Sequence, residues 1–285
     1  MWQSNLFWAG CIPALILLAA VSFERWRRKR KGERSPLPDK LLRPPGYSLQ
    51  RKLEDLHDSL MTWFMAAFLF SILIVIFPKT RPTDVWAPFV ALVIFGLIAV
   101  ACTIVALRKL NQIHKYRRGL LGEQAVAEQL HSLTASGYRV FHDILKDGNG
   151  NIDHAVVGPA GVFAIETKYR TKQPGQAGEQ DHKAEFDGTK IQFPSGYDAK
   201  APEQARQNAR WLATMLSKAT GKPVTVQPIV ALPGWWVTLK ANSDVKVLSG
   251  KQIPGFIAKE PAQLSGQVIQ QISYQLEQRC RDVEF

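Results

Sequence analysis

The sequence predicts an α/β protein in which a folded domain follows a membrane anchor of three transmembrane helices. The anchor is predicted by three long apolar runs, without a charged residue, within the first 107 positions. The domain is predicted by the pattern of apolar residues after position 118, which gives the element order α-β-β-β-α-β. That order is typical of an α/β sandwich, a mixed sheet flanked by helices, and 285 residues leave room for one or two domains.

The predicted spans cover approximately residues 6–23, 60–77 and 85–107. Each run is close to the ~20 apolar residues that a helix needs to cross the hydrocarbon core of a bilayer. A buried core helix is the alternative, but three runs that lack a polar face argue against it. Tryptophans near the run ends, where interfacial aromatic residues are found, agree with the membrane interpretation: Trp8, Trp63 and Trp86.

Lys and Arg residues set the predicted orientation of the anchor. They concentrate in the long loop 24–59 and directly after the third run, at 108–118. Because basic loops stay on the cytoplasmic side, we expect the N-terminus outside and the C-terminal domain in the cytoplasm. The expected location is therefore the inner (cytoplasmic) membrane, as a multi-pass protein. No basic region precedes the first run, so a cleaved signal peptide is not expected.

Most of the net charge of +12 belongs to the anchor. Residues 1–109 contain 15 Lys+Arg against 7 Asp+Glu, whereas the rest of the chain contains 21 against 17. The basic excess therefore does not indicate a nucleic-acid-binding surface on the domain.

The end of the basic loop has the spacing of a helix. Four leucines recur at helical intervals after Ser48, a candidate N-cap: Leu49, Leu53, Leu56 and Leu60. This helix is either a cytoplasmic extension of the second span or an interfacial amphipathic helix.

The chain divides into an anchor (1–118), a core (119–235) and a C-terminal segment (236–285) that completes the domain. In the core, we expect a helix at 120–135, strands at 138–144, 151–158 and 162–169, a helix at 200–219 and a strand at 225–232. The C-terminal segment adds a strand at 245–249 and a helix at about 261–281. The turn "GPAG" at 158–161 joins two strands as a hairpin, and a polar, Gly-rich insert occupies 171–190.

Charged residues interrupt this otherwise apolar hairpin. Glu166 and Lys168 alternate onto one face of the second strand, and a simple register places Asp153 across from them. A charge inside a core costs several kcal/mol unless it is paired or bound to a metal. Two carboxylates and an ammonium are therefore expected to meet at one end of the sheet.

Two helical residues show the same anomaly. Glu123 falls on the inward stripe of the first helix, and Gln204 shares helical spacing with Asn208. Each residue also has a structural explanation: a surface ion pair for Glu166 and Lys168, a turn cap for Asp153, a helix-dipole acid for Glu123 and plain helix surface for Gln204. Their shared placement favours a site.

Four segments resemble the nuclease-related domain (NERD) family, which is placed among the PD-(D/E)xK, restriction-endonuclease-like nucleases. They are "GLLGEQAVAEQL", "GYRVFHDI", "GNIDHAVVGPAGVFAIETKYR" and "APEQARQNARWL", within residues 119–235. The resemblance implies a restriction-endonuclease-like core in which Asp153, Glu166 and Lys168 correspond to the catalytic D…ExK triad. Glu123 would match the helical acid of the family and Gln204 its glutamine, and no position departs from the motif.

A triad of this kind implies hydrolysis of a phosphodiester bond with a hard divalent cation, Mg²⁺ or Mn²⁺. Asp153 and Glu166 would hold the ion, with Thr167 as a further oxygen ligand. Lys168 would polarise the attacking water or neutralise the charge of the transition state. Glu123 would orient a metal-bound water or help to hold a second ion, because the sequence does not decide between one metal ion and two. Gln204 would support a ligand or contact a phosphate.

Substrate contacts are less defined. Basic residues that could follow a phosphate backbone are Lys146, Arg170, Lys172, Lys183, Lys190, Arg206 and Arg210. The motif "PGWW" (233–236) either offers aromatic faces to bases or covers the edge of the core. The histidines His142, His154 and His182 lack a zinc-binding spacing.

The leading hypothesis is a membrane-anchored nuclease whose partners are the lipid bilayer and nucleic acid, with DNA and RNA both open and the oligomeric state undetermined. A tethered module that binds nucleic acid or protein without catalysis is the alternative. A third hypothesis makes the domain a docking unit of a membrane assembly.

Overall fold

The structure of the protein, a computed structural model, describes residues 40–76, 86–148, 150–172 and 182–283. It also describes Ala20, Phe23, Glu24, Trp26 and Arg27. The chain divides into two units, residues 1–40 with 283–285, and residues 41–282. The second unit contains the helices and the sheets that bear on function.

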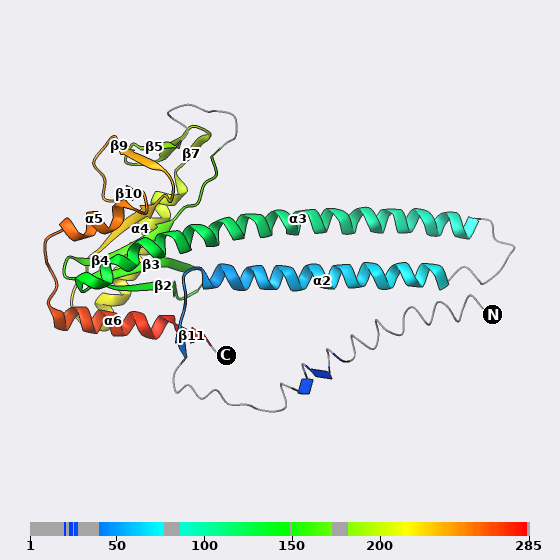
Figure 1. Cartoon of the computed structure of the whole chain (residues 1–285), viewed down its shortest axis with the longest axis horizontal. Coiled ribbons are helices and arrows are strands. Elements are labelled where there is room, and N and C mark those ends of the chain that lie inside the picture. Colours follow the sequence, from blue (N-terminus) through cyan, green and yellow to red (C-terminus); the bar gives the residue numbers. More distant parts are fainter. Residues whose placement is uncertain are drawn as a thin grey trace. The chain divides into compact units, whose positions relative to one another are not determined.

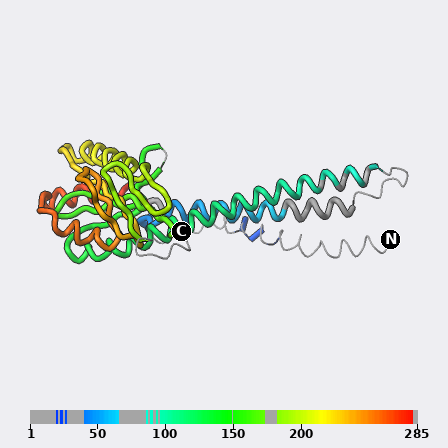
Figure 2. The backbone as a smooth tube through the Cα atoms, turned by 90° about the horizontal axis from the view of Figure 1, so that it is seen from above, coloured from blue at the N-terminus to red at the C-terminus, as the bar shows by residue number. Residues whose placement is uncertain are grey.

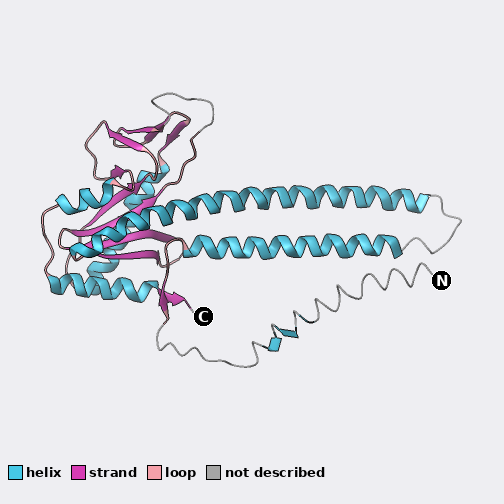
Figure 3. Cartoon of the chain, in the orientation of Figure 1, coloured by secondary structure: helices cyan, strands magenta, loops and turns pink. Residues whose placement is uncertain are grey.

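A five-stranded mixed sheet forms the centre of this unit (Figures 1 and 3). Its strands, in spatial order, are β10 (Lys246–Leu248), β8 (Val226–Ala231), β4 (Gly161–Thr167), β3 (Asn151–Gly158) and β2 (Arg139–Leu145). Strands β2, β3 and β4 run antiparallel to one another, as the predicted hairpin requires, whereas β8 runs parallel to both β4 and β10. The central strand β4 reads Val-Phe-Ala-Ile because helices cover both of its faces.

Helices cover the two faces of the sheet. On one face, α3 (Trp86–His131) and α5 (Gln252–Lys259) pack through residues such as Leu130 and Ile253. On the other, α4 (Lys200–Thr220) and α6 (Gly266–Cys280) pack through Leu212 and Leu276. The prediction of an α/β protein with a mixed sheet flanked by helices is confirmed.

Helix α3 joins two elements that the sequence analysis kept apart. The predicted span 85–107 and the predicted helix 120–135 form one continuous α-helix, Trp86–His131. The segment between them, 108–118, contains neither Gly nor Pro and is rich in Lys and Arg, which are good helix formers. The predicted domain boundary at 118/119 therefore falls inside a helix, and the division into domains stays a prediction.

Helix α2 (Tyr47–Ile76) packs against the middle of α3, and Figure 2 shows the two side by side from a second direction. Leu53 and Leu60 of α2 are buried against Ile113 of α3. Lys109 of α3 donates a hydrogen bond to Ser59 Oγ at 2.7 Å. The leucine stripe after Ser48 thus belongs to one unbroken helix and contacts protein.

Among the described residues, one helix is long and apolar enough to cross a membrane, the part of α3 that starts at Gly96. Its apolar side chains face outward: Leu97 is 66 % exposed and Leu107 is 55 % exposed. The second predicted span forms the C-terminal part of α2, and the first lies almost entirely outside the described residues. Three spans are therefore not established.

The insert after β4 folds into strands that the sequence analysis did not predict. β5 (Lys183–Phe186), β6 (Ile191–Phe193) and β7 (Gly196–Asp198) form a second sheet with β9 (Trp236–Leu239). These strands have three or four residues each, too few for their periodicity to show. The predicted helix at 261–281 begins later, at Gly266, and α5 precedes it. Leu41–Leu42 (β1) and Arg281–Val283 (β11) add a two-stranded sheet.

Candidate active site

The predicted triad lies where β3 and β4 stop pairing. The register pairs His154 with Ile165, so the next position places Asp153 opposite Glu166. Beyond that point the two strands no longer pair through their backbones. The Thr167 N–H of β4 instead donates a hydrogen bond to the side chain of Asp153, at Oδ2, over 2.7 Å. This bond fixes the Asp153 carboxylate against the end of β4.

Glu123 reaches the same place from α3. It is 6 % exposed, and its Oε2 atom is buried without a hydrogen-bond partner. The preceding residue, Gly122, allows the helix to approach so closely, since a Cβ atom there would lie 2.9 Å from Tyr169 Cβ. Glycine at position 122 thus allows α3 to bring the carboxyl group of Glu123 to the end of β3 and β4.

These residues line one cleft of about 470 Å³. All six predicted site residues contribute to its lining: Glu123, Asp153, Glu166, Thr167, Lys168 and Gln204. Three basic residues share the cleft, namely Lys115 and Arg118 of α3 and Arg170 after β4. Leu49 of α2 also lines it, so the helix next to the predicted anchor forms part of the wall.

Burial and mutual repulsion perturb the carboxyl groups of the cleft. Burial, followed by repulsion from Asp153, raises the pKa of Glu123 to about 9. Burial also raises the pKa of Asp153, to about 7, although the N–H of Thr167 opposes the shift. The pKa of Glu166 is raised well above its ordinary value, mainly by burial and by Asp153. The titrations of these three carboxyl groups depend on one another. Binding of protons or of a cation is favoured over a state in which all three are negatively charged.

Lys168 stands at the mouth of the cleft. Its side chain is 41 % exposed, and its Nζ lies 3.8 Å from Asp198 Oδ2 on β7. The ammonium therefore lies between the buried carboxyl groups and the small sheet. Gln204 is exposed on the first turns of α4, at the same opening.

Two further residues support Glu166, and sequence reasoning did not assign them this role. Asn208 of α4 is 1 % exposed, and its Nδ2 donates to Glu166 Oε2 at 3.0 Å. Lys146, which follows β2, donates from Nζ to Asn208 Oδ1 at 2.8 Å. The available signal was the position of Asn208, one helical turn after Gln204 on the inward stripe.

Asp143 of β2 is a fourth buried carboxylate that the sequence analysis missed. The register of β2 with β3 places it opposite Asp153, and it has a positive φ of 52°. Its Oδ2 accepts hydrogen bonds from Arg43 Nη1 at 2.9 Å, the Ser48 backbone N–H at 3.0 Å and Ser48 Oγ at 2.8 Å. Its Oδ1 accepts one from the Asn151 side chain. Asp143 thereby fastens the start of α2 to the sheet beside the cleft.

Two histidines form a separate pair, in which His154 is buried and His142 is half-buried. His142 Nδ1 and His154 Nδ1 are 2.8 Å apart, and burial lowers the pKa of both rings. One ring therefore donates and the other accepts, in neutral form. His182 lies apart from them, on the loop before β5.

A divalent cation fits the chemistry of the cleft in part. In the part of the chain that the structure describes, no group of three or more His, Cys, Asp and Glu side chains is arranged to hold a metal ion. Mg²⁺, however, is usually held by one or two carboxylates, with waters and phosphates completing its shell. Asp153 and Glu166 supply two, and the buried atoms Glu123 Oε2 and Thr167 Oγ1 have no hydrogen-bond partner.

Comparison with known proteins gives a family for this region. Residues 118–233 match the NERD family, described as a nuclease-related domain. No curated protein and no solved structure matches the chain. The matched segment contains all six predicted site residues as well as Asp143 and Asn208. The match supports the NERD family for residues 118–233, and with it a nuclease-like function.

Proposed function

We propose that the protein is a membrane-anchored, metal-dependent nuclease that hydrolyses phosphodiester bonds of DNA or RNA on the cytoplasmic side. One observation carries the proposal: three buried, proton-retaining carboxyl groups and a lysine line one cleft inside a segment that matches a nuclease-related domain. Strongly perturbed carboxyl groups in a cleft are typical of catalytic sites.

The proposed ligands of Mg²⁺ or Mn²⁺ are Asp153 and Glu166, with Thr167 as a further oxygen ligand. A bound cation would supply Lewis-acid stabilisation of the negative charge that develops on the phosphoryl oxygens. The chain prepares both ligands: the Thr167 N–H fixes Asp153, and Asn208 orients Glu166. Ligands fixed in this way need little reorganisation when the substrate arrives.

The other groups act on the substrate and on protons. Lys168 would neutralise charge on the scissile phosphate or position the attacking water. Glu123, with its pKa of about 9, carries a proton near neutral pH and can exchange it with a water in the cleft. Lys115, Arg118 and Arg170 would hold flanking phosphates, and Gln204 would contact the backbone at the opening.

The membrane part of the proposal rests on α3 and on charge. An apolar helix whose side chains are exposed is stable in a bilayer and costly in water. The Lys and Arg residues at 24–59 and 108–118 support a cytoplasmic location for the following domain. A reporter fused after residue 285 tests this orientation, and a periplasmic signal would overturn it.

The catalytic proposal is tested with the full chain in detergent, because Leu49 lines the cleft and Ser48 supports it. We expect cleavage of nucleic acid with Mg²⁺, none with EDTA, and a loss of at least ~10³-fold in Glu166→Ala and Lys168→Ala. Glu185→Ala removes a half-exposed glutamate of β5 and serves as the matched control. Wild-type protein that cuts neither single- nor double-stranded DNA or RNA, with Mg²⁺ or Mn²⁺, would contradict the proposal.

A second candidate function is a tethered module that binds nucleic acid or protein without cutting. It is favoured by the absence of a three-residue metal group in the described residues, together with carboxyl groups that retain protons near neutral pH. A neutral cleft with a basic rim can hold a phosphate backbone without a cation. Binding that persists in EDTA and in Glu166→Ala, with no cleavage under any condition, would identify this function.

A further inference from the structure

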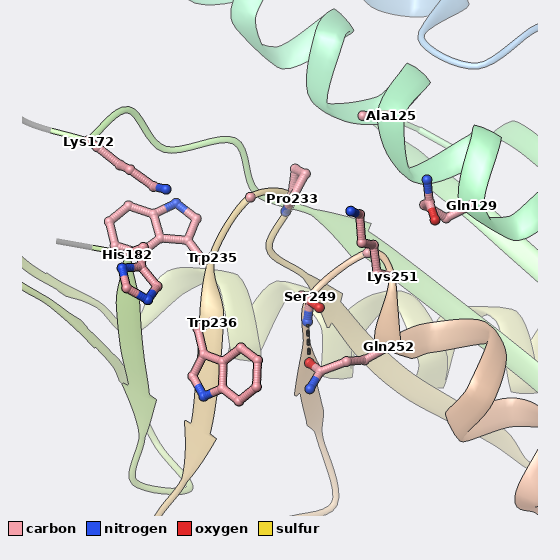
Figure 4. A pocket seen from close by; sticks show the side chains of 12 residues that line it. Ala125, Gln129, Lys172, His182, Pro233, Trp235, Trp236, Ser249, Lys251 and Gln252 are labelled. Atoms are coloured by element: carbon pink, nitrogen blue, oxygen red, sulfur yellow. Dashed lines mark hydrogen bonds between the residues drawn. The ribbon is translucent and has the colours of Figure 1, made fainter. Parts of the chain in front are cut away.

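A second pocket of about 470 Å³, shown in Figure 4, is lined in part by residues that adjoin those of the candidate active site in the sequence. Four parts of the chain build it: α3, the segment after β4, the loop 233–236 and the turn before α5. Helix α3 and the segment after β4 line both this pocket and the cleft of the candidate active site. Residues 168–171 line the cleft and Lys172 lines the pocket, while α3 contributes Glu123 to the cleft and Gln129 to the pocket.

The tryptophan pair at this pocket has divided roles. Trp235 is 4 % exposed, packs edge-on against Phe193 at 4.9 Å, and donates from Nε1 to the Arg170 carbonyl at 3.1 Å. It therefore covers a core and braces a residue of the cleft. Trp236 is 60 % exposed, although its indole lies along the pocket wall. A large aromatic ring that is exposed to solvent at the wall of a pocket indicates a binding site.

The charge of the pocket indicates which partner. Among the described residues that line it, Lys172 and Lys251 are basic, His182 is an imidazole and none is acidic. Neither lysine has an ion pair among the described residues, and the Lys172 ammonium lies 6.0 Å from the Trp235 ring. The exposed indole of Trp236 lines the same pocket as these two ammonium groups. The indole can stack on a flat ring and the ammonium groups attract an anion, and a nucleotide combines a flat ring with an anion.

We propose that this pocket binds an unpaired base and its phosphate when single-stranded nucleic acid lies in the catalytic cleft. The base would stack on Trp236, and Lys172 and Lys251 would contact the adjoining phosphates. The pocket residues Ala125 and Gln129 follow the cleft residue Glu123 by two and six positions on α3, a rise of roughly 3 to 9 Å along the helix. That distance spans only a few nucleotides. The inference rests on the proposed function, because it treats the pocket as a continuation of the nuclease cleft.

The pocket implies a preference for single strands, or for ends and loops, over blunt duplexes. A base inside a duplex is already stacked and cannot reach Trp236 without unpairing. Because every base has a π face, the preference does not depend on sequence. A ribose 2′-hydroxyl is not required for stacking, so the pocket accepts DNA and RNA alike.

The test measures binding without turnover. The full chain in detergent with EDTA is titrated into fluorescently labelled oligonucleotides: a single-stranded DNA, the same sequence as RNA, and a blunt duplex. We expect tighter binding of both single strands than of the duplex. Trp236→Ala should weaken single-strand binding roughly tenfold or more and leave duplex binding nearly unchanged. Trp236→Phe should retain part of the affinity.

Controls separate stacking and charge from general damage. Tyr274→Ala removes a comparably exposed aromatic ring, 58 % exposed on α6, and should bind like the wild type. Lys172→Ala/Lys251→Ala should flatten the salt dependence of binding, whereas Lys259→Ala at the far end of α5 should not. Wild-type protein that does not bind single strands, or a Trp236→Ala variant that binds like the wild type or loses duplex affinity equally, would overturn the inference. Because EDTA prevents turnover, this result is independent of whether the wild type cuts nucleic acid with Mg²⁺.

Discussion

Asp143 and Asp153 lie opposite each other on neighbouring strands, yet their surroundings differ in kind. Asp143 is fully buried and accepts four hydrogen bonds, one of them from a guanidinium group. Asp153 shares its surroundings with Glu123 and Glu166, and these three carboxyl groups have few donors between them. A buried carboxylate whose hydrogen bonds are all satisfied stabilises the fold. A buried carboxyl group with few hydrogen-bond donors around it can bind a ligand.

The largest expected effect comes from breaking the paired carboxylate. Asp143→Asn removes the negative charge of the buried ion pair with Arg43, which should cost about 3–5 kcal/mol of the free energy of unfolding. Asp147→Asn is the matched control: its pair with Arg279 is as short, at 2.6 Å, but Asp147 is 73 % exposed. It should cost at most ~1 kcal/mol. Denaturant unfolding of the full chain in detergent measures both, and equal costs would remove the distinction between the two sites.

A smaller effect is expected from loosening a carboxyl group of the cleft. Asn208→Ala removes the donor to Glu166 Oε2 and the acceptor of Lys146, so cleavage or metal affinity should fall roughly 10–100-fold. Gln207→Ala, the exposed neighbour on α4, serves as the control. Raising the Mg²⁺ concentration should recover part of the Asn208→Ala rate. Unchanged cleavage in Asn208→Ala would show that Glu166 needs no support.

The smallest expected effect is a slope of stability with pH. Glu123 has a pKa of about 9 in the folded protein and near 4.5 when unfolded, so the folded state binds more protons between these values. The contribution of Glu123 to stability should therefore be fully present below about pH 4.5 and be lost as the pH rises toward 9, by roughly 2–4 °C in Tm per pH unit. Glu123→Gln should flatten the slope. Mg²⁺ should raise the Tm more at high pH than at low pH, because it competes with protons.

The sequence predicted the residues that line the cleft better than the residues that hold the surrounding structure in place. Asp153, Glu166 and Glu123 stand out because charge in an apolar pattern is visible in a linear sequence. Asp143 does not stand out, since its partners Arg43 and Ser48 lie about 100 positions away and only the fold brings them near. Sequence patterns show local periodicity, but they do not predict contacts between segments that are distant in the sequence.

The same limit explains the differences in the fold. The strands of the insert are too short to show alternation, and the Lys- and Arg-rich segment 108–118 looks like a linker although it continues α3. The motif at 233–236 left two interpretations open. The buried Trp235 covers the edge of the core, whereas Trp236 is exposed, and stacking of a base on its ring stays a prediction.

The unbroken course of α3 has a mechanical consequence. Leu107 and Glu123 are sixteen residues apart on one helix, a rise of about 24 Å. A flexible linker of that length would let a domain sweep through a wide volume, but a helix acts as a stiff spacer. If the apolar half of α3 lies in a bilayer, the proposed nuclease would work at a fixed height above the lipid surface. Only nucleic acid that comes to that surface would be cut, and the rest of the cell's DNA and RNA would stay out of reach.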